Sequence, residues 1–270
     1  MKTAVLMFAA VFLLAGCGEQ EPEGQSAAPT TTHTYDFSYD RYQQLLSRYV
    51  VDGRVDYSGL KANRDQLDTL VARLATADLK AATELQQLAF YINAYNMLVL
   101  RTIIDHYPVN SIQDIEGALD GKRWAVAGQS LTLDEIDHDI LGKKFNEPRY
   151  HMAINRGANG APPLVSQPYY PNNISDQLEL VSRYFSSSEK YNRIDPKAGK
   201  AELSQVFEWI GEELIPGYYD NGLFSNLCQE ENAAVTFVIK HHPADQQSAL
   251  FASDYRLNFR EYDWSLNDLR

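Results

Sequence analysis

Cysteine and basic residues are both scarce in this sequence. Its 270 residues include two cysteines, Cys17 and Cys228, and 24 Lys and Arg against 36 Asp and Glu, a formal net charge of −12. Phosphate backbones are polyanions that bind clustered Lys and Arg, and the chain has no basic run, so we expect no nucleic acid partner. Anionic lipid headgroups also repel an acidic surface. Contact with a membrane therefore needs something other than a basic face.

Several signatures of catalysis are missing as well. The sequence has no Gly-x-Ser-x-Gly elbow, no Gly-x-Gly-x-x-Gly and no phosphate-binding loop, so nothing predicts a serine hydrolase or a nucleotide cofactor. No pair of histidines has a metal-ligand spacing such as His-x-x-x-His. We therefore expect neither a cofactor nor a metal. Cys228 follows the apolar stretch 223–227 with no cation nearby, which predicts a buried, inert thiol.

The first sixteen residues read as an export signal. Lys2 precedes an apolar run from Ala4 to Leu14, which is shorter than the about 20 residues of a membrane-spanning helix and fits a signal-peptide core. The run leads into Leu-Ala-Gly-Cys17, which resembles a bacterial lipobox. We therefore expect a signal peptide at 1–16 and lipidation of the Cys17 thiol, including palmitate. The alternative is an ordinary signal peptide with an incidental cysteine.

The residues after the lipobox bear on where the domain is held. Residues 17–34 are rich in Gly, Glu, Gln, Ser, Pro and Thr and have no apolar periodicity, so we expect a flexible tether behind the lipidated cysteine. Gly18 stands where an Asp signals retention at the inner membrane of a Gram-negative cell. The expected location is therefore the periplasm, on a lipid anchor in the outer membrane, with a folded domain at 35–270.

Most of residues 35–270 show helical periodicity. The strongest pattern, at 84–107, is apolar around most of its circumference and predicts a core helix that ends at Pro108. Thr132 and Glu135 form a capping box that opens another helix. We expect one α+β domain, mostly helical, with a small antiparallel sheet. Further elements are expected as helices at 175–185, 204–214 and 230–240, a hairpin at 124–131 with Gly128 at its tip, and strands at 150–154 and 255–262.

Two asparagines lie inside the predicted core helix. Asn93 and Asn96 are three residues apart, so they share one helix face. A buried carboxamide without partners costs about 1–3 kcal/mol, so both side chains need hydrogen bonds. Two interpretations stay open: a structural polar network that ties the helix to a loop, or a pocket lined by one of the amides.

An acidic run with a histidine follows the capping box. Asp134 and His138 are four residues apart and are expected on the same helix face. A carboxylate beside an imidazole raises its basicity and fixes its orientation, which is half of a general base. The alternative is a solvated acidic helix end with an incidental histidine.

A polar, glycine-rich loop leaves the predicted strand at 150–154. His151 lies in that strand, and Asn155 and Arg156 begin the loop, which holds two Gly and two Pro by residue 163. Such loops are common places for sites, and an arginine fork fits a carboxylate or a phosphate. The alternative is a structural turn, with the His151 side chain buried in the core and hydrogen-bonded there.

Taken in order, these segments resemble the domain of unknown function 547 family. The resemblance covers about 35–267, nearly all of the predicted domain, and it implies a domain without implying an activity. The motifs that carry it are at 52–57, 88–96, 106–109, 133–138, 151–164, 207–209 and 262–267.

Two cysteine positions of this family are occupied differently here. Family members commonly read Asn-Cys-Ala-Ser, followed shortly by Cys-Pro-Pro-Leu. Asn155 and the Pro-Pro-Leu at 162–164 match, but Arg156 and Ala161 stand at the cysteine positions. The resemblance therefore cannot imply a thiol nucleophile of the papain or transglutaminase type in this chain. His138 and His151 match family positions and remain available as acid, base or ligand-binding groups.

The leading hypothesis is a lipid-anchored periplasmic domain that binds a small molecule or peptide in a pocket. The first alternative is a cysteine-less enzyme of hydrolase or acyl-transfer type. The second is an envelope protein-interaction module without a pocket. The ligand-binding candidates are Asn93, Asn96, Asn155 and Arg156, and the candidate catalytic bases are His138 and His151.

Overall fold

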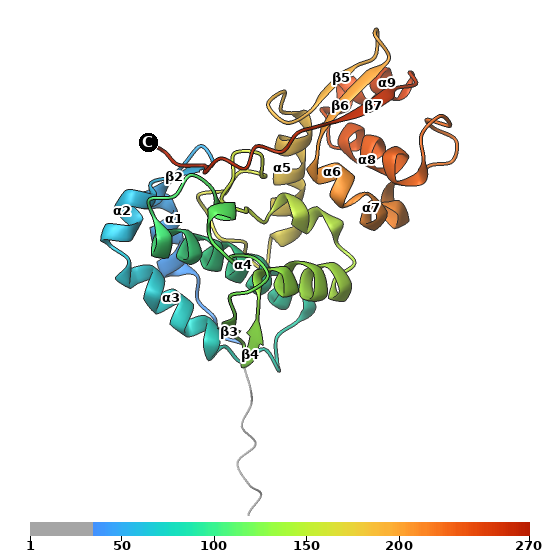
Figure 1. The fold of residues 1–270 in the computed structure, drawn as a ribbon. Helices are drawn as coiled ribbons and strands as arrows, with labels where there is room; N and C mark the ends of the chain where they lie inside the picture. Colours follow the sequence, from blue (N-terminus) through green and yellow to red (C-terminus); the bar gives the residue numbers. More distant parts are fainter. Residues whose placement is uncertain (1–34) are drawn as a thin grey trace, which may run out of the picture. The chain divides into compact units, whose positions relative to one another are not determined.

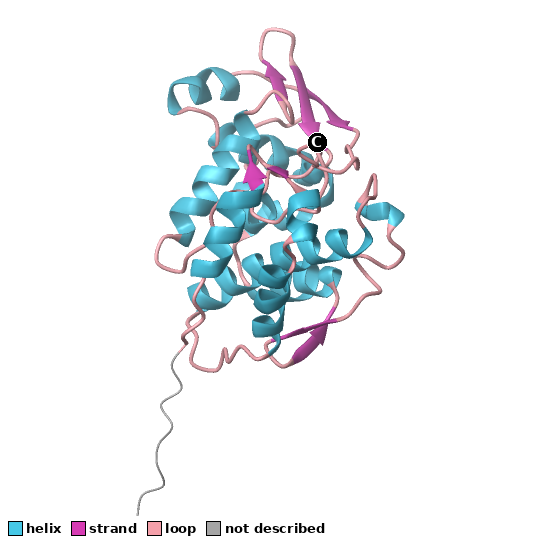
Figure 2. Ribbon diagram, turned by 90° about the vertical axis from the view of Figure 1, so that its left-hand side faces the viewer, coloured by secondary structure: helices cyan, strands magenta, loops and turns pink. Residues whose placement is uncertain are grey.

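The computed structural model describes residues 35–270, which lie within one compact unit (Figure 1). The signal peptide, Cys17 and the tether predicted for 1–34 lie outside the described residues. Among the described helices, none combines the length and the apolar character needed to span a bilayer. Helices make up most of the regular structure and the strands are short (Figure 2). The predicted mostly helical α+β class is confirmed.

Helix α4 (Glu84–His106) forms the centre of the core, as the sequence predicted. Almost every side chain between residues 88 and 104 is buried, because this stretch is apolar on all sides. Thr83 and Gln86 close a capping box at its start. Three shorter helices pack around α4 and one another: α1 (Asp40–Tyr49), α2 (Tyr57–Ala62) and α3 (Asp65–Ala75).

Two short hairpins flank these helices. Strands β1 (Val50–Val51) and β2 (Arg54–Val55) pair antiparallel, as do β3 (Trp124–Val126) and β4 (Gln129–Leu131). The tip of the second hairpin is Ala127-Gly128, and both residues have positive φ angles, 48° and 75°. A two-residue turn of this kind matches the twist of its strands, so the hairpin predicted from Gly128 is confirmed.

The segment between the second hairpin and helix α5 (Ile174–Ser187) corrects one prediction. The capping box of Thr132 and Glu135 is present and opens η2 (Glu135–Gly142), which is wound as a π-helix. The strand predicted at 150–154 is wrong, because the chain forms a 3-10 helix, η3 (Pro148–Met152). A short apolar run fits a buried helical turn as well as a strand. Here Pro148 begins the turn, and the Glu147 side chain caps it.

The C-terminal third contains the largest sheet. Its order is β5-β6-β7: β5 (Arg193–Asp195) pairs antiparallel with β6 (Lys200–Ser204), and β6 pairs parallel with β7 (Arg256–Arg260). The parallel pair departs from the expected antiparallel sheet. It arises because the chain passes through four helices before β7 returns in the direction of β6. These are α6 (Val206–Trp209), α7 (Gly211–Tyr218), α8 (Gln229–Lys240) and α9 (Ala244–Phe251).

The helices predicted in this third have mixed outcomes. Helix α5 (Ile174–Ser187) and helix α8 confirm the predictions for 175–185 and 230–240. The helix predicted for 204–214 is divided at Ile210, and its first residue belongs to β6.

Residues 262–270 form a tail that returns from β7 across the molecule (Figure 1, red). Backbone hydrogen bonds join the tail to the loop after η3: Asn159 N–H donates to the Ser265 carbonyl and Gly160 N–H to the Asp263 carbonyl, both at 2.8 Å. Further along, the Val55 N–H donates to the Asn267 carbonyl at 2.9 Å. The tail therefore fixes the outer side of the 155–163 loop, while α4 supports the side of the loop that faces the core.

Candidate functional site

Both asparagines of α4 are committed to the fold. The Asn93 amide donates to the Tyr169 carbonyl at 2.8 Å and accepts from the Tyr169 N–H at 2.9 Å. The Asn96 amide donates to the Ala153 carbonyl at 2.9 Å and accepts from the Asn155 N–H at 2.9 Å. Both side chains are buried, and each binds backbone groups as a two-point clamp. Of the two interpretations of Asn93 and Asn96, this arrangement matches the structural polar network that ties the helix to a loop.

Asn155 and the glycine that follows Arg156 shape the loop. The Asn155 side chain donates to the Pro162 carbonyl at 2.6 Å and accepts from the Gly157 N–H at 2.7 Å. Gly157 has a φ of +70°, and a Cβ built there would lie 2.3 Å from Cδ1 of Ile103. Only glycine combines this backbone angle with so close an approach to α4. The two residues therefore fix the direction in which Arg156 leaves the loop.

Arg156 is a nearly buried cation that pairs with a buried carboxylate. Its Nη2 donates to Oδ2 of Asp137 at 2.6 Å, and the two side chains are 12% and 1% exposed. Burial lowers the pKa of Arg156, but the charge of Asp137 outweighs burial and raises it, so the guanidinium stays charged. Its carbon Cζ also lies 5.8 Å from the centre of the Trp209 ring.

His151 lies between two carboxylates. Its Nε2 is 2.9 Å from Oε2 of Glu213, and its Nδ1 is 3.9 Å from Oδ1 of Asp137, too far for a hydrogen bond. The imidazole ring packs on Tyr150 with ring centres 4.0 Å apart. Burial raises the pKa of Glu213, but the hydrogen bond from His151 and its charge prevail and lower it.

Three buried polar atoms of this cluster have no hydrogen-bond partner among the described residues: Oδ1 of Asp137, Nδ1 of His151 and the hydroxyl of Tyr95. Burial raises the pKa of Tyr95, and the charges of Arg156 and Asp137 both act on its hydroxyl, so these groups lie close together. Unsatisfied buried polar atoms are costly, so each of these three needs an explanation, such as a bound water, a ligand or a role in catalysis.

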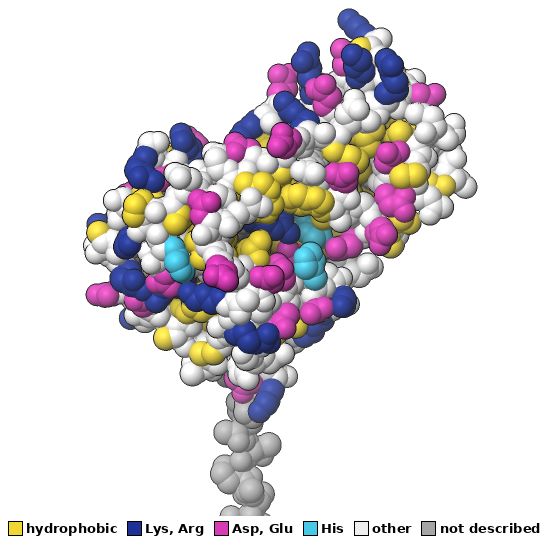
Figure 3. Space-filling model, in the orientation of Figure 1, with side chains coloured by type: hydrophobic (Ala, Val, Ile, Leu, Met, Phe, Trp, Pro, Cys, Tyr) yellow, Lys and Arg dark blue, Asp and Glu magenta, His cyan; other side chains and the backbone are white. Residues whose placement is uncertain are grey.

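Three aromatic side chains cover the cluster. The ring of Tyr262 is 4.9 Å from that of Trp209 and 4.5 Å from that of Trp264. Tyr262 is buried, whereas Trp209 is 43% exposed. Hydrophobic side chains, flanked by acidic ones, gather on the face drawn in Figure 3. The buried charges are therefore next to an aromatic surface that solvent reaches.

His138 lies at the exposed edge of this cluster, where its charge helps to lower the pKa of Glu213. Its side chain is exposed, while its neighbour Asp137 points inward. Burial raises the pKa of Asp134 and the charge of His138 opposes that rise, so the predicted proximity of these two residues holds. Asp137 lies on the buried face of η2 with Ile136 and Leu141 and is directed to Arg156, whereas His138 lies on the exposed face.

Cys228 corrects another prediction, because its side chain is exposed rather than buried. Its backbone N–H donates to Glu231 at the start of α8. Burial of part of the thiol and the neighbouring glutamates raise its pKa, which disfavours the reactive thiolate. None of its interactions involves His151 or Arg156.

The sequence missed four residues of the cluster: Asp137, Tyr95, Trp209 and Glu213. Asp137 belongs to the acidic run, but the four-residue spacing from Asp134 pointed to its neighbour His138. Tyr95 lies between the two asparagines on α4, and its aromatic ring was interpreted as part of the hydrophobic core. Trp209 and Glu213 come from α6 and α7, more than 50 residues after Arg156, and no local signal connects them to it.

The arrangement can bind and can move a proton. An arginine with free N–H groups binds carboxylates, and a histidine beside carboxylates accepts or donates a proton. Among residues 35–270, no group of three or more His, Cys, Asp or Glu side chains is placed to hold a metal ion.

One family comparison bears on this site. Residues 79–185 match the model of the family described as "Protein of unknown function, DUF547". The match confirms the family resemblance over that segment. It includes α4, η2, η3 and the loop, and therefore every described site residue that was predicted from the sequence. It ends before Trp209, Glu213 and Tyr262. Comparisons with curated proteins and with solved structures gave no match.

Proposed function

We propose that this protein is a lipoprotein anchored through Cys17 to the outer membrane, and that its periplasmic domain binds a small molecule or peptide at Arg156. The ligand group that best fits the site is a carboxylate. The single observation that carries the binding proposal is the guanidinium of Arg156, held in a nearly buried position under exposed Trp209 with donors to spare.

The free donors of Arg156 support a carboxylate. Asp137 takes one N–H of Nη2, and the guanidinium also hydrogen-bonds the Tyr262 hydroxyl, which leaves further N–H groups of the fork for a ligand. A guanidinium presents five donors in a planar fork that matches a carboxylate with two parallel hydrogen bonds. The apolar part of such a ligand would pack against Trp209, which is 43% exposed.

The binding proposal is tested by native mass spectrometry of the purified protein, followed by titration with an acetylated dipeptide as free acid and as amide. We expect a co-purified adduct and an affinity for the acid at least about 10-fold above that for the amide, because charge-assisted hydrogen bonds contribute about 1.5–3 kcal/mol. Arg156→Lys keeps the charge opposite Asp137 but loses the fork, and Trp209→Ala removes the half-exposed ring beside the guanidinium. Both should weaken binding.

The matched control is Arg183→Met, which removes an exposed arginine of α5 that pairs with Glu179. It should leave binding unchanged. Equal affinity for acid and amide, or unchanged binding in both Arg156→Lys and Trp209→Ala, contradicts the proposed site.

A second candidate function is hydrolysis or acyl transfer with His151 as base. The hydrogen bond of 2.9 Å between His151 and Glu213 favours it, since a carboxylate orients an imidazole for proton transfer. Because Arg156 occupies the family's cysteine position, the nucleophile would be a water molecule. Hydrolysis of p-nitrophenyl acetate that is lost in His151→Gln and kept in His138→Gln would support this function. Equal rates in the two variants would refute it.

The third candidate function, a protein-interaction module of the envelope, is supported by one feature of α5. Leu180 and Tyr184 lie one turn apart on α5 and are 68% and 55% exposed, a small apolar surface for a partner protein. Loss of a co-purified partner in Leu180→Ser/Tyr184→Ser would support it.

The lipid anchor has its own test. Cells that express the full chain are labelled with radioactive palmitate, and Cys17→Ala should abolish the label. Cys228→Ala is the matched control, because it removes the other cysteine and should retain the label. Unchanged labelling in Cys17→Ala would remove the basis for the membrane location.

A further inference from the structure

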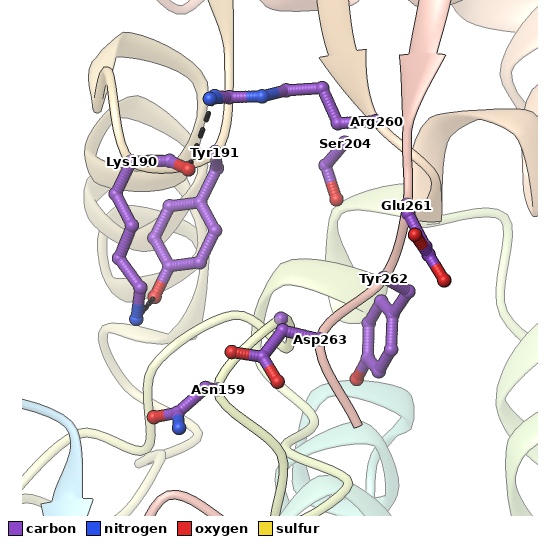
Figure 4. A pocket seen from close by; sticks show the side chains of 9 residues that line it. Asn159, Lys190, Tyr191, Ser204, Arg260, Glu261, Tyr262 and Asp263 are labelled. Carbon is purple, nitrogen blue, oxygen red and sulfur yellow. Dashed lines mark hydrogen bonds between the residues drawn. The ribbon is translucent and has the colours of Figure 1, made fainter. Parts of the chain in front are cut away.

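A pocket lies where β7 leads into the tail. Its volume is about 240 Å³, below the roughly 300–1,000 Å³ of pockets for drug-sized ligands, so it suits a molecule of about one ring. Four segments form it (Figure 4): the 155–163 loop, the turn after α5, the end of β6, and the end of β7 with the start of the tail. The residues used below are Asn159, Lys190, Tyr191, Ser204, Arg260 and Asp263.

The walls of this pocket are fixed by the fold. Nη1 of Arg260 donates to the carbonyls of Glu189 and Lys190 at 2.9 and 3.2 Å, which anchors the turn. Tyr191 is buried and packs on Phe185 with ring centres 4.4 Å apart. The pocket therefore exists before a ligand arrives, which lowers the entropic cost of binding.

Unused hydrogen-bond donors line the pocket. Nζ of Lys190 donates to the Tyr191 hydroxyl at 3.0 Å, and its two other N–H groups have no partner among the described residues. Burial lowers the pKa of Lys190, and the nearby charge of Asp263 opposes that decrease. The Ser204 hydroxyl accepts from the Val206 N–H, and its own hydrogen is left over.

Unused acceptors face the same space. Oδ1 of Asp263 accepts from the Ser265 N–H and hydroxyl, which leaves Oδ2 free. The Asn159 amide donates to Ser265 and to the Leu266 carbonyl, which leaves its own oxygen free. The lining thus contains donors and acceptors in similar number, and its two cations, Lys190 and Arg260, are balanced by two anions, Glu261 and Asp263.

We propose that this pocket binds a neutral saccharide unit. Each sugar hydroxyl donates and accepts at once, so a sugar ring satisfies both kinds of leftover group, with its apolar atoms against Tyr191 and Tyr262. A simple anion fits less well, because the free oxygen of Asp263 repels it. A simple cation is repelled by Lys190 and Arg260. The site goes beyond the carboxylate site at Arg156, and the two proposals fail separately.

The test uses the purified full-length protein with methyl glycosides of glucose, galactose and mannose and with N-acetylglucosamine, followed by saturation-transfer NMR and titration. We expect saturable binding of at least one of them. Lys190→Met and Asp263→Asn should each weaken it about 10-fold, the loss expected for one charge-assisted hydrogen bond. Lys197→Met, in the exposed turn between β5 and β6, is the matched control and should bind like the original protein.

Three results would overturn the proposal. They are the absence of saturable binding for all four sugars, sugar binding that is unchanged in both Lys190→Met and Asp263→Asn, and binding of acetate or phosphate alone that is lost in Lys190→Met. The last result would assign the pocket to anions.

Discussion

Replacing Arg156 by methionine tests whether the buried ion pair organises the site. Methionine replaces the unbranched apolar stem of arginine but lacks the guanidinium, so the Asp137 carboxylate, 1% exposed, is left without its cation. Removing one partner of a buried pair costs about 3–5 kcal/mol, because the other charge stays desolvated. For a chain of this size about 1 kcal/mol corresponds to about 2–4 °C, so the midpoint of thermal unfolding should fall by roughly 6–20 °C.

A double-mutant cycle separates the charge from the packing. In Arg156→Met/Asp137→Asn both charges are gone, so the double variant should recover part of the stability that Arg156→Met alone loses. Urea unfolding followed by circular dichroism measures the free energy of unfolding of each variant. The surface control Arg183→Met removes an exposed pair with Glu179 and should cost less than about 1 kcal/mol.

The reasoning fails under two outcomes. Arg156→Met could lose less than about 1 kcal/mol, which would mean that solvent already compensates Asp137. The double variant could also be no more stable than Arg156→Met, which would place the loss in packing and not in charge.

Three further substitutions test the supports of the site. Asn96→Ala leaves a backbone N–H and a carbonyl unpaired in the core and should cost about 2–5 kcal/mol in urea unfolding, whereas a cost below 1 kcal/mol would mean that water replaces the clamp. Gly157→Ala forces a Cβ toward Ile103 at positive φ and should cost about 2–4 kcal/mol; a neutral result would show that the loop relaxes. The lowered pKa of Glu213 stabilises the fold above its ordinary value of 4.5, and this contribution is lost as the pH falls. The difference in melting temperature between the original protein and Glu213→Gln should therefore shrink from pH 7 to pH 4, and a constant difference would contradict the role of the His151 hydrogen bond.

The sequence by itself determined the elements whose signals are local. The apolar circumference of α4, the capping box of Thr132 and Glu135 and the turn at Gly128 each act within one or two turns of chain, and all three form as predicted. The family motifs also identified the loop from Asn155 to Arg156, because their order along the chain needs no tertiary information.

The tertiary structure decided which side chains meet. Asp137 rather than His138 reaches Arg156, because the packing of η2 buries the face that carries Asp137, Ile136 and Leu141 and exposes His138. Trp209 joins the site from α6 and Glu213 from α7, and the tail brings Tyr262 over it, through contacts between residues far apart in sequence. The short apolar run at 150–154 fitted a strand and a helical turn equally well, and only its packing as η3 separated them. Periodicity describes one element at a time, whereas a site depends on how several elements pack together.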